Sequence, residues 1–181
     1  RILPIVKKYG TAVVGLALDE NGIPPKAEQR FAIAEKIMNR AVAMGIPKRD
    51  VFIDCLTLTA SAQQEGVMET VKALHRVKTE LGLKTVLGVS NISFGLPNRE
   101  LINSNFLQIC LVSGLDLPII NPNVAAMTGD VRAYKLLANI DKDSMEFIAA
   151  YNNAAPAPAA NAGTARTENA TAEGLLFAVQ N

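Results

Sequence analysis

The sequence predicts an α/β protein with a parallel sheet. Four short apolar runs, beginning near residues 11, 51, 85 and 117, are rich in β-branched side chains, and each is followed by a segment with helical periodicity. Parallel strands need crossovers of this kind, so the alternation predicts either a doubly wound open sheet or a (β/α)8 barrel. Four units make only half of a barrel.

The first half of the chain supplies two of these units. Residues 1–10 have the spacing of a helix end, with lysines near the close and a glycine stop. The run TAVVGLAL at 11–18 is almost continuously apolar, which predicts a parallel strand buried on both faces. An Asn-Gly turn follows, and two prolines suited to a first helical turn open a helix over 24–45. The pattern then recurs as a strand at 51–53 and a helix over 61–82.

The second half supplies the other two units. The apolar run at 85–87 predicts the third strand, and apolar residues at helical spacing predict a helix over 97–114 that ends at a glycine. A fourth strand is predicted at 117–120, where the chain turns at an Asn-Pro pair. Further helical patterns are found at 131–138 and 145–151.

The composition of the chain changes after these elements. Residues 153–170 are rich in alanine, proline and asparagine and lack apolar periodicity, which predicts an extended linker. Residues 171–181 begin a new helical pattern that the chain does not finish. Because the first helix also begins in mid-pattern, we expect this chain to be a piece of a longer protein.

Composition limits the classes of function. The 181 residues are 49% hydrophobic and 19% charged, which suits one globular domain with a real core. The 18 basic and 17 acidic residues give a formal net charge of +1, so we expect no nucleic acid and no anionic membrane as partner. No run approaches the roughly 18 apolar residues of a membrane span, and the N-terminus lacks a signal-peptide layout. We therefore expect a cytoplasmic protein.

The residue types that bind metals are sparse. Cys55 and Cys110 are isolated in the sequence and lack the spacing of a zinc site, which predicts reduced, structural thiols. His75 is the only histidine, and we expect it on the surface of its helix. The sequence therefore predicts no metal site.

The stretch TVLGVSNISFGLPNR at 85–99 is the candidate functional site. The apolar run leads into a glycine and three small polar residues, Ser90, Asn91 and Ser93, and a proline then opens the next helical pattern. In an α/β protein, such a passage from strand to loop to helix lies at the carboxyl end of the sheet, where binding and catalytic groups collect.

Three motifs at the ends of successive strands resemble one family. They are FIDCLT at 52–57, GVSNISFGLPNR at 88–99 and LPIINP at 117–122. Together they resemble the pterin-binding domain of cobalamin-dependent methionine synthase and the related methyltetrahydrofolate:corrinoid methyltransferases. The resemblance covers residues 1–152 and implies a (β/α)8 TIM barrel of which this chain holds strands five to eight. It further implies that 153–181 lead toward a cobalamin-associated domain.

The resemblance assigns Asn91 to catalysis. A tertiary amine is a poor leaving group, so moving the methyl group from N5 of methyltetrahydrofolate requires developing charge or a proton at N5 to be stabilised. An amide can hydrogen-bond N5 and hold a network whose bonds strengthen in the transition state. Asp54 matches the family carboxylate that accepts hydrogen bonds from the pterin. Their alternative roles are a turn residue for Asn91 and a helix cap for Asp54.

Five further residues are candidate pterin-binding groups on the same comparison. Gly88 and Ser90 would let the backbone approach the flat ring, and Ser93 would support Asn91 or serve only the turn. Arg99 matches a family position near the pterin, although an arginine in a first helical turn is often a solvated or paired charge. Asn121 would line the pocket or form an Asn-Pro turn.

The resemblance also implies what this chain lacks. In the family further pterin-contacting groups lie on earlier strands, so half of the pocket would come from an N-terminal half-barrel that is missing here. Methyltetrahydrofolate is the implied substrate, and cobalamin would be bound by another domain or protein because the chain has no Asp-x-His-x-x-Gly motif. This fragment alone is therefore expected to be inactive.

Two other interpretations stay open. Dihydropteroate synthase is also a pterin barrel, but its corresponding loop resembles Gly-x-Ser-Arg-Lys, whereas this chain has GVSNI at 88–92 and lacks both cations. Alternatively, the chain is an inactive fragment or an interaction module. An exposed strand edge would then drive association, and a homodimer could rebuild a barrel.

Overall fold

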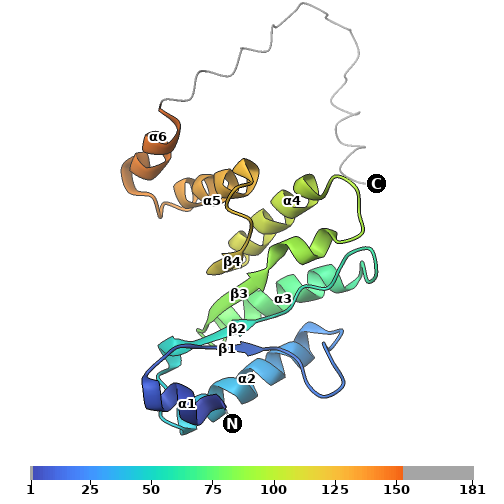
Figure 1. Ribbon diagram of the computed structural model, residues 1–181, viewed down its shortest axis with the longest axis vertical. Coiled ribbons are helices and arrows are strands. Elements are labelled where there is room, and N and C mark those ends of the chain that lie inside the picture. The colour runs from blue at the N-terminus through green and yellow to red at the C-terminus, as the bar shows by residue number, and fades with distance from the viewer. Residues whose placement is uncertain (1, 153–181) are drawn as a thin grey trace, which may run out of the picture. The chain divides into compact units, whose positions relative to one another are not determined.

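The computed structural model describes residues 2–152 (Figure 1). The linker expected at 153–170 and the helix expected at 171–181 lie outside the described residues. Contacts divide the chain into two units with a boundary between Phe147 and Ile148, and all four strands belong to the first unit. In chain order the elements are α1 (Ile2–Tyr9), β1 (Val13–Leu16), α2 (Ala27–Ala43), η1 (Lys48–Asp50), β2 (Val51–Asp54), α3 (Gly66–Thr79), β3 (Lys84–Gly88), η2 (Val89–Ser93), α4 (Arg99–Val112), β4 (Leu117–Ile119), α5 (Ala125–Leu137), η3 (Lys142–Ser144) and α6 (Met145–Tyr151).

The four strands form one parallel sheet in chain order, β1-β2-β3-β4. Their register aligns one row of residues across the sheet, in which Leu16 pairs with Asp54, Asp54 with Val86, and Val86 with Leu117. Two pairs further along, Gly88 is aligned with Ile119. All four strands therefore end at the same edge of the sheet, and each was predicted from its apolar run.

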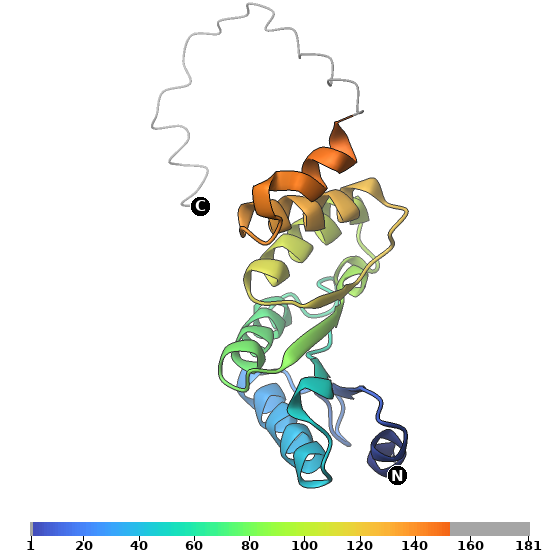
Figure 2. The same ribbon diagram turned by 90° about the vertical axis from the view of Figure 1, so that its left-hand side faces the viewer.

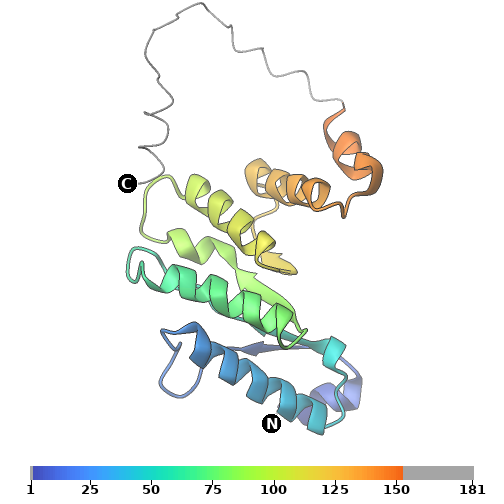
Figure 3. The ribbon, with the colours of Figure 1, turned by 180° about the vertical axis from the view of Figure 1, so that it is seen from behind.

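Helices cover only one face of this sheet. Figure 3 shows α2, α3 and α4 lying side by side across it, and Figure 2 shows the sheet and this helix layer from the side. The core lies between the two layers, and side chains from alternate strand positions, such as Val51, Ile53 and Leu87, are fully buried in it. From the helices, Ala34, Leu74 and Leu107 are fully buried in the same cluster.

The opposite face of the sheet is open. Val14 and Leu16 in β1 are 51% and 46% exposed, and Ile119 in β4 is 60% exposed. The prediction that the strand at 11–18 is buried on both faces is therefore wrong for the described residues, because no helix covers this side. A doubly wound sheet carries helices on both faces, so the single helix layer and the unbroken strand order fit the arc of a barrel instead.

Several helix boundaries also differ from the predicted ones. Helix α2 begins at Ala27, two residues after the proline pair, and α3 begins at Gly66 because consecutive turns occupy the residues from Thr59 to Gly66. Helix α5 begins at Ala125, six residues before the predicted start at 131. Its first turn contains small residues that give no clear apolar periodicity.

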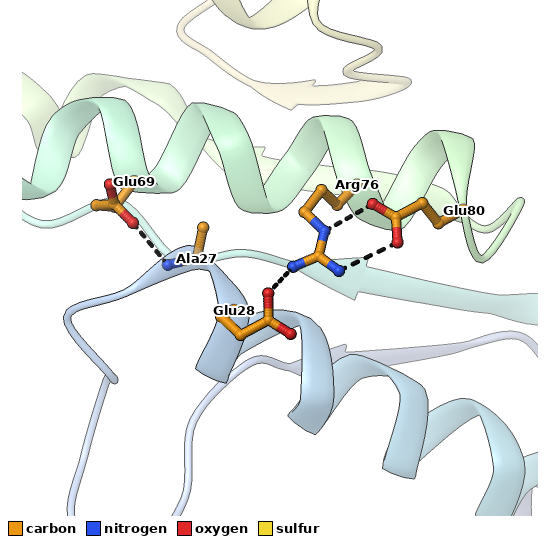
Figure 4. Close-up of polar contacts among 5 residues, drawn as sticks. All are labelled: Ala27, Glu28, Glu69, Arg76 and Glu80. Carbon is orange, nitrogen blue, oxygen red and sulfur yellow. Dashed lines mark hydrogen bonds and ion pairs between the residues drawn. The ribbon is translucent and has the colours of Figure 1, made fainter.

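Polar contacts join α2 and α3 on the solvent side of the helix layer (Figure 4). The Glu69 carboxylate accepts a hydrogen bond from the Ala27 N–H at 2.8 Å, which satisfies one of the free N–H groups in the first turn of α2. The Arg76 guanidinium binds both Glu28 and Glu80. Its central carbon also lies 4.1 Å from the centroid of the Phe31 ring. These contacts tie α2 to α3 at the outer surface of the helix layer.

Both cysteines are packing residues. Cys55 and Cys110 are free and buried, and burial raises the pKa of each thiol to about 12, so neither forms a reactive thiolate near neutral pH. His75 is exposed on α3, as expected. Within residues 2–152 no helix is both long enough and apolar enough to cross a membrane.

We predict that Glu69→Gln lowers the stability of the fold in a pH-dependent manner. The Ala27 N–H, followed by the Lys72 ammonium, lowers the pKa of Glu69, so its ionised form stabilises the folded state above the unfolded pKa of about 4.3. This stabilisation is lost as the pH falls through the lower folded pKa. Thermal unfolding should show a lower midpoint for the variant at about pH 7 and a small difference at about pH 3.

Glu35→Gln is the matched control, because Glu35 is exposed on α2 and has no hydrogen bond or ion pair among the described residues. An equal loss of stability in both variants at neutral pH would contradict a stabilising role for the hydrogen bond between Ala27 and Glu69.

Candidate functional site

A cleft of about 630 Å³ lies where β2, β3 and β4 end. It brings together five of the seven residues that the sequence singled out: Asp54, Gly88, Ser90, Asn91 and Asn121. The remaining wall is contributed by Ile23, Leu56, Thr57, Ile119 and Ile120. The cleft therefore combines apolar walls with a few convergent polar groups, as small-molecule sites do.

Asp54 is the last residue of β2 and is partly buried at the cleft. Its Oδ1 accepts a hydrogen bond from the Leu56 N–H at 2.8 Å, and Leu56 has a positive φ of 61°. Burial raises the pKa of the Asp54 carboxyl, and the hydrogen bond from Leu56 partly opposes this rise. Asp54 does not cap α3, which begins twelve residues later at Gly66. Its carboxylate is available to accept hydrogen bonds from a ligand.

Asn91 lies on a short 3-10 helix, η2, that directly follows β3. The sequence predicted a loop here and missed the helix. The Asn91 side chain is exposed and makes no hydrogen bond to the other described residues, while its main-chain carbonyl accepts one from Phe94. A Cβ atom at Gly88 would lie 3.1 Å from Asn91 Nδ2. The absence of a side chain at Gly88 thus leaves room for the amide of Asn91.

Ser93 and Arg99 do not line this cleft. Ser93 is buried, and its hydroxyl lies 3.3 Å from the Ser90 carbonyl oxygen, to which it donates. Arg99 donates from Nε to Ser93 Oγ and from Nη2 to the Ser90 carbonyl, both at 3.0 Å. The Arg99 guanidinium therefore holds the turn carrying Asn91 through neutral acceptors, and it lines a neighbouring cleft of about 340 Å³ together with Ser90 and Asn121.

Asn121 combines both roles considered for it. Its Oδ1 accepts a hydrogen bond from the Asn123 N–H at 3.0 Å, which forms a turn, and the residue also lines both clefts. The turn therefore fixes the side-chain oxygen and leaves the amide nitrogen free for another partner.

Sequence reasoning missed the apolar walls and Thr57. Thr57 is 9% exposed, lines the cleft, and its hydroxyl oxygen is buried without a hydrogen-bond partner among the described residues. The signal that could have found it is its place in the FIDCLT motif at 52–57. Ile119 and Ile120 were predicted as strand residues. The structure shows that β4 ends at Ile119 and that both isoleucines line the cleft.

The described residues contain no group of three or more histidine, cysteine, aspartate or glutamate side chains that could hold a metal ion. His75 lies on the outer surface, beside a separate cleft lined by Glu28 and Arg76.

Comparison with known sequences identifies the family. The profile of the family described as pterin binding enzyme matches residues 1–121, which include β1 to β4 and every residue of the candidate site. The chain belongs to the pterin-binding enzyme family. This family has a TIM-barrel fold, in agreement with the parallel sheet and its single layer of helices.

Individual members of the pterin-binding family agree with this assignment. Over 129 residues the chain is 37% identical to methionine synthase from Mycobacterium leprae (strain TN) and 36% identical to that from Mycobacterium tuberculosis (strain ATCC 25618 / H37Rv). These matches cover 67% of this chain and 11% of each synthase. The chain is 24% identical over 133 residues to a methylcorrinoid:tetrahydrofolate methyltransferase from Eubacterium limosum, covering 72% of this chain and 48% of that protein. The chain thus spans only part of each of these relatives.

We predict that Gly88→Ala displaces the Asn91 amide. The backbone of Gly88 has a negative φ of −75°, which alanine adopts without strain, so the new methyl group acts mainly through its contact at 3.1 Å. The amide should move by about a few tenths of an ångström, because real Cβ contacts are seldom this close. A crystal structure of the variant, or the NMR shifts of the Asn91 side-chain amide, will test this.

Gly66→Ala serves as the control, because its Cβ atom would make only an ordinary contact of 3.4 Å with Gln63. Unchanged Asn91 shifts in Gly88→Ala would show that the cleft has more room than the backbone indicates.

Proposed function

We propose that this chain is the pterin-binding portion of a methyltransferase that moves the N5-methyl group of 5-methyltetrahydrofolate to a corrinoid in methionine synthesis. The observation that carries the proposal is the cleft that collects Asp54, Gly88, Ser90, Asn91 and Asn121 at the ends of successive strands. Two relatives are named for methionine synthesis and one for methyl exchange between a corrinoid and tetrahydrofolate. We place this enzyme in the cytoplasm as part of the same proposal.

Asn91 is the proposed catalytic residue. Its side chain is exposed to the cleft and is not used by another described residue, so its amide is free to hydrogen-bond N5 of the substrate. An amide does not titrate near neutral pH, so it acts by holding a hydrogen-bond network that strengthens as charge develops at N5. The turn held by Arg99 and Ser93 fixes the main chain beneath this side chain.

Asp54 is the proposed anchor for the pterin ring. One of its oxygens is fixed by the Leu56 N–H, and the carboxylate can accept hydrogen bonds from the amino and ring N–H groups of a pterin. Gly88 and Ser90 let the backbone approach the ring, and Ile119 and Ile120 supply apolar contacts for the flat pterin ring. Asn121 offers its free amide nitrogen at the rim.

The corrinoid is assigned to another domain or protein. The chain contains one histidine, His75, which lies on the outer surface of α3 and does not line the cleft. The described residues therefore do not fit a histidine-ligated cobalt, and the chain's contribution is to bind and orient the methyl donor. A corrinoid bound by that domain or protein would supply the methyl acceptor.

The cleft favours methyl transfer over a dihydropteroate synthase reaction. Its lining residues, all within the described part of the chain, include no lysine or arginine, and Arg99, which lies near the turn of Asn91, is engaged with Ser90 and Ser93. A pyrophosphate leaving group needs cationic partners in the site. An N5-methyl donor does not.

The open face of the sheet supports a further part of the proposal. We propose that β1 to β4 are strands five to eight of a barrel and that residues 1–152 are its carboxyl-terminal half. Four preceding βα units would then cover Val14, Leu16 and Ile119 and supply the rest of the pterin pocket. A homodimer that joins exposed strand edges and so rebuilds a barrel is the alternative arrangement.

We predict that Asn91→Ala and Asp54→Asn separate catalysis from binding in the full-length gene product. Asn91→Ala should slow methyl transfer from 5-methyltetrahydrofolate to cob(I)alamin by about 10²-fold and leave much of the affinity intact. Asp54→Asn keeps the acceptor for Leu56 but loses the charge, so it should weaken binding by about tenfold or more. Stopped-flow absorbance of the cobalt species measures transfer, and equilibrium dialysis measures affinity.

A methyl-transfer rate that Asn91→Ala leaves unchanged would remove Asn91 from the mechanism. Arg76→Met, on the outer helix surface, is the control for both assays.

We also predict that the 181-residue chain by itself binds 5-methyltetrahydrofolate weakly or not at all, because the cleft has walls from only four strands. Equilibrium dialysis of this chain against the full-length gene product measures the difference, and light scattering gives the mass of each. Micromolar affinity of a monomeric chain would show that the further strands are not needed. Equal affinity of a dimer would favour the homodimer.

A further inference from the structure

One buried cation lies beneath the cleft and is not used by the proposed reaction. Arg30 extends from the first turns of α2 and is fully buried. Its Nε donates to the Pro24 carbonyl at 2.7 Å, and its Nη1 lies within hydrogen-bond distance of the carbonyls of Cys55, at 3.2 Å, and Leu56, at 3.1 Å. Nη1 also lies 2.6 Å from the hydroxyl of Thr70 on α3.

The partners of Arg30 are main-chain carbonyls and a hydroxyl, not acids. None of the ion pairs among the described residues involves Arg30, and burial lowers the pKa of its guanidinium. Its Nη2 is buried without a partner in the described part of the chain. Burying a charge without an acidic partner costs free energy, which hydrogen bonds to the charge must offset. The same hydrogen bonds fix the positions of the carbonyls that Arg30 binds.

Two of those carbonyls, from Cys55 and Leu56, belong to the strained turn that follows β2. Leu56 has a φ of 61°, a conformation that costs free energy for a residue with a branched side chain and persists only where its surroundings hold it. The Leu56 carbonyl is held by Arg30 and lies 3.3 Å from the Thr70 hydroxyl, while its N–H is bound to Asp54 Oδ1. Both hydrogen-bonding groups of Leu56 are therefore engaged, one by the helix layer and one by the site.

We propose that Arg30, together with Thr70, is a positioning residue that holds Leu56 in its strained conformation and thereby orients the Asp54 carboxylate toward the ligand. The inference rests on the proposed function in one respect, namely that Asp54 binds the pterin. Without the guanidinium, the Leu56 backbone relaxes, its N–H leaves Asp54, and the carboxylate loses its fixed orientation. The loss acts on affinity for the methyl donor rather than on the transfer step.

The test compares three variants of the full-length gene product with a matched control. Arg30→Met and Thr70→Val each remove a polar group that holds Leu56, and Thr70→Ser keeps the hydroxyl. Arg76→Met is the control, because Arg76 also bridges α2 and α3 but binds Glu28 and Glu80 at the solvent side, away from the turn (Figure 4). A purely structural role in joining the two helices predicts similar effects for Arg30→Met and Arg76→Met.

We expect Arg30→Met and Thr70→Val to raise the dissociation constant for 5-methyltetrahydrofolate by about tenfold. At saturating substrate, the rate of methyl transfer should stay within about threefold of that of the unaltered protein. Thr70→Ser should restore affinity, and Arg76→Met should leave it unchanged. Equal affinities for Thr70→Val and the unaltered protein would overturn the proposal, and Thr70→Val provides this test even where Arg30→Met does not fold.

A second readout needs no ligand. Amide hydrogen exchange of Leu56, measured by NMR or mass spectrometry, should be about tenfold faster in Thr70→Val and Arg30→Met and unchanged in Arg76→Met. If Arg30→Met or Thr70→Val folds and its Leu56 amide exchanges at an unchanged rate, the positioning role is overturned. Faster exchange in a protein that does not bind 5-methyltetrahydrofolate at all would support the positioning role and reject the proposed function, so the two failures are distinguishable.

Discussion

The parallel pairing of four consecutive strands is the constraint on which the site depends. Because every strand points the same way and pairs with its neighbour in sequence, all four carboxyl ends meet at one edge of the sheet. The register then places Asp54 at the end of β2 and Gly88 at the end of β3, while Asn121 follows β4 by two residues. Residues separated by more than 60 positions thus line a single cleft.

The loops at this edge are held by arginines from the helix layer. The turn after β2 is bound by Arg30 of α2, and the 3-10 helix after β3 is bound by Arg99 of α4. Arg30 donates to the carbonyls of Cys55 and Leu56, whereas Arg99 donates to the Ser90 carbonyl and the Ser93 hydroxyl. Arg30 is buried and Arg99 is exposed, yet each holds a loop that carries a site residue, because a planar group with five donors can bind several acceptors at once.

The sequence predicted the strands well because each one is a short apolar run with turn signals on both sides. Five of the seven residues that it singled out line the cleft, because strand ends can be located without knowing how the loops fold. It could not predict the turns at Thr59 to Gly66 or the 3-10 helix at Val89–Ser93, since both depend on local main-chain hydrogen bonds rather than periodicity. The contacts of Arg30 span 40 residues along the chain, and no local pattern in the sequence reports them.

Burial on both faces was predicted for β1 from its apolar run. One face of β1 is open among the described residues, so burial of that face would need a covering polypeptide. Leu16 is 46% exposed and Ile119 is 60% exposed, so covering each would add roughly half of the 1.5 to 3 kcal/mol that complete burial of such a side chain contributes. Ile119 is 60% exposed on the open sheet and also lines the cleft, so the two surfaces are continuous. A polypeptide that covered this face would therefore also add to the lining of the proposed pterin site. Under the half-barrel proposal, one packing step completes both the hydrophobic core and the binding pocket.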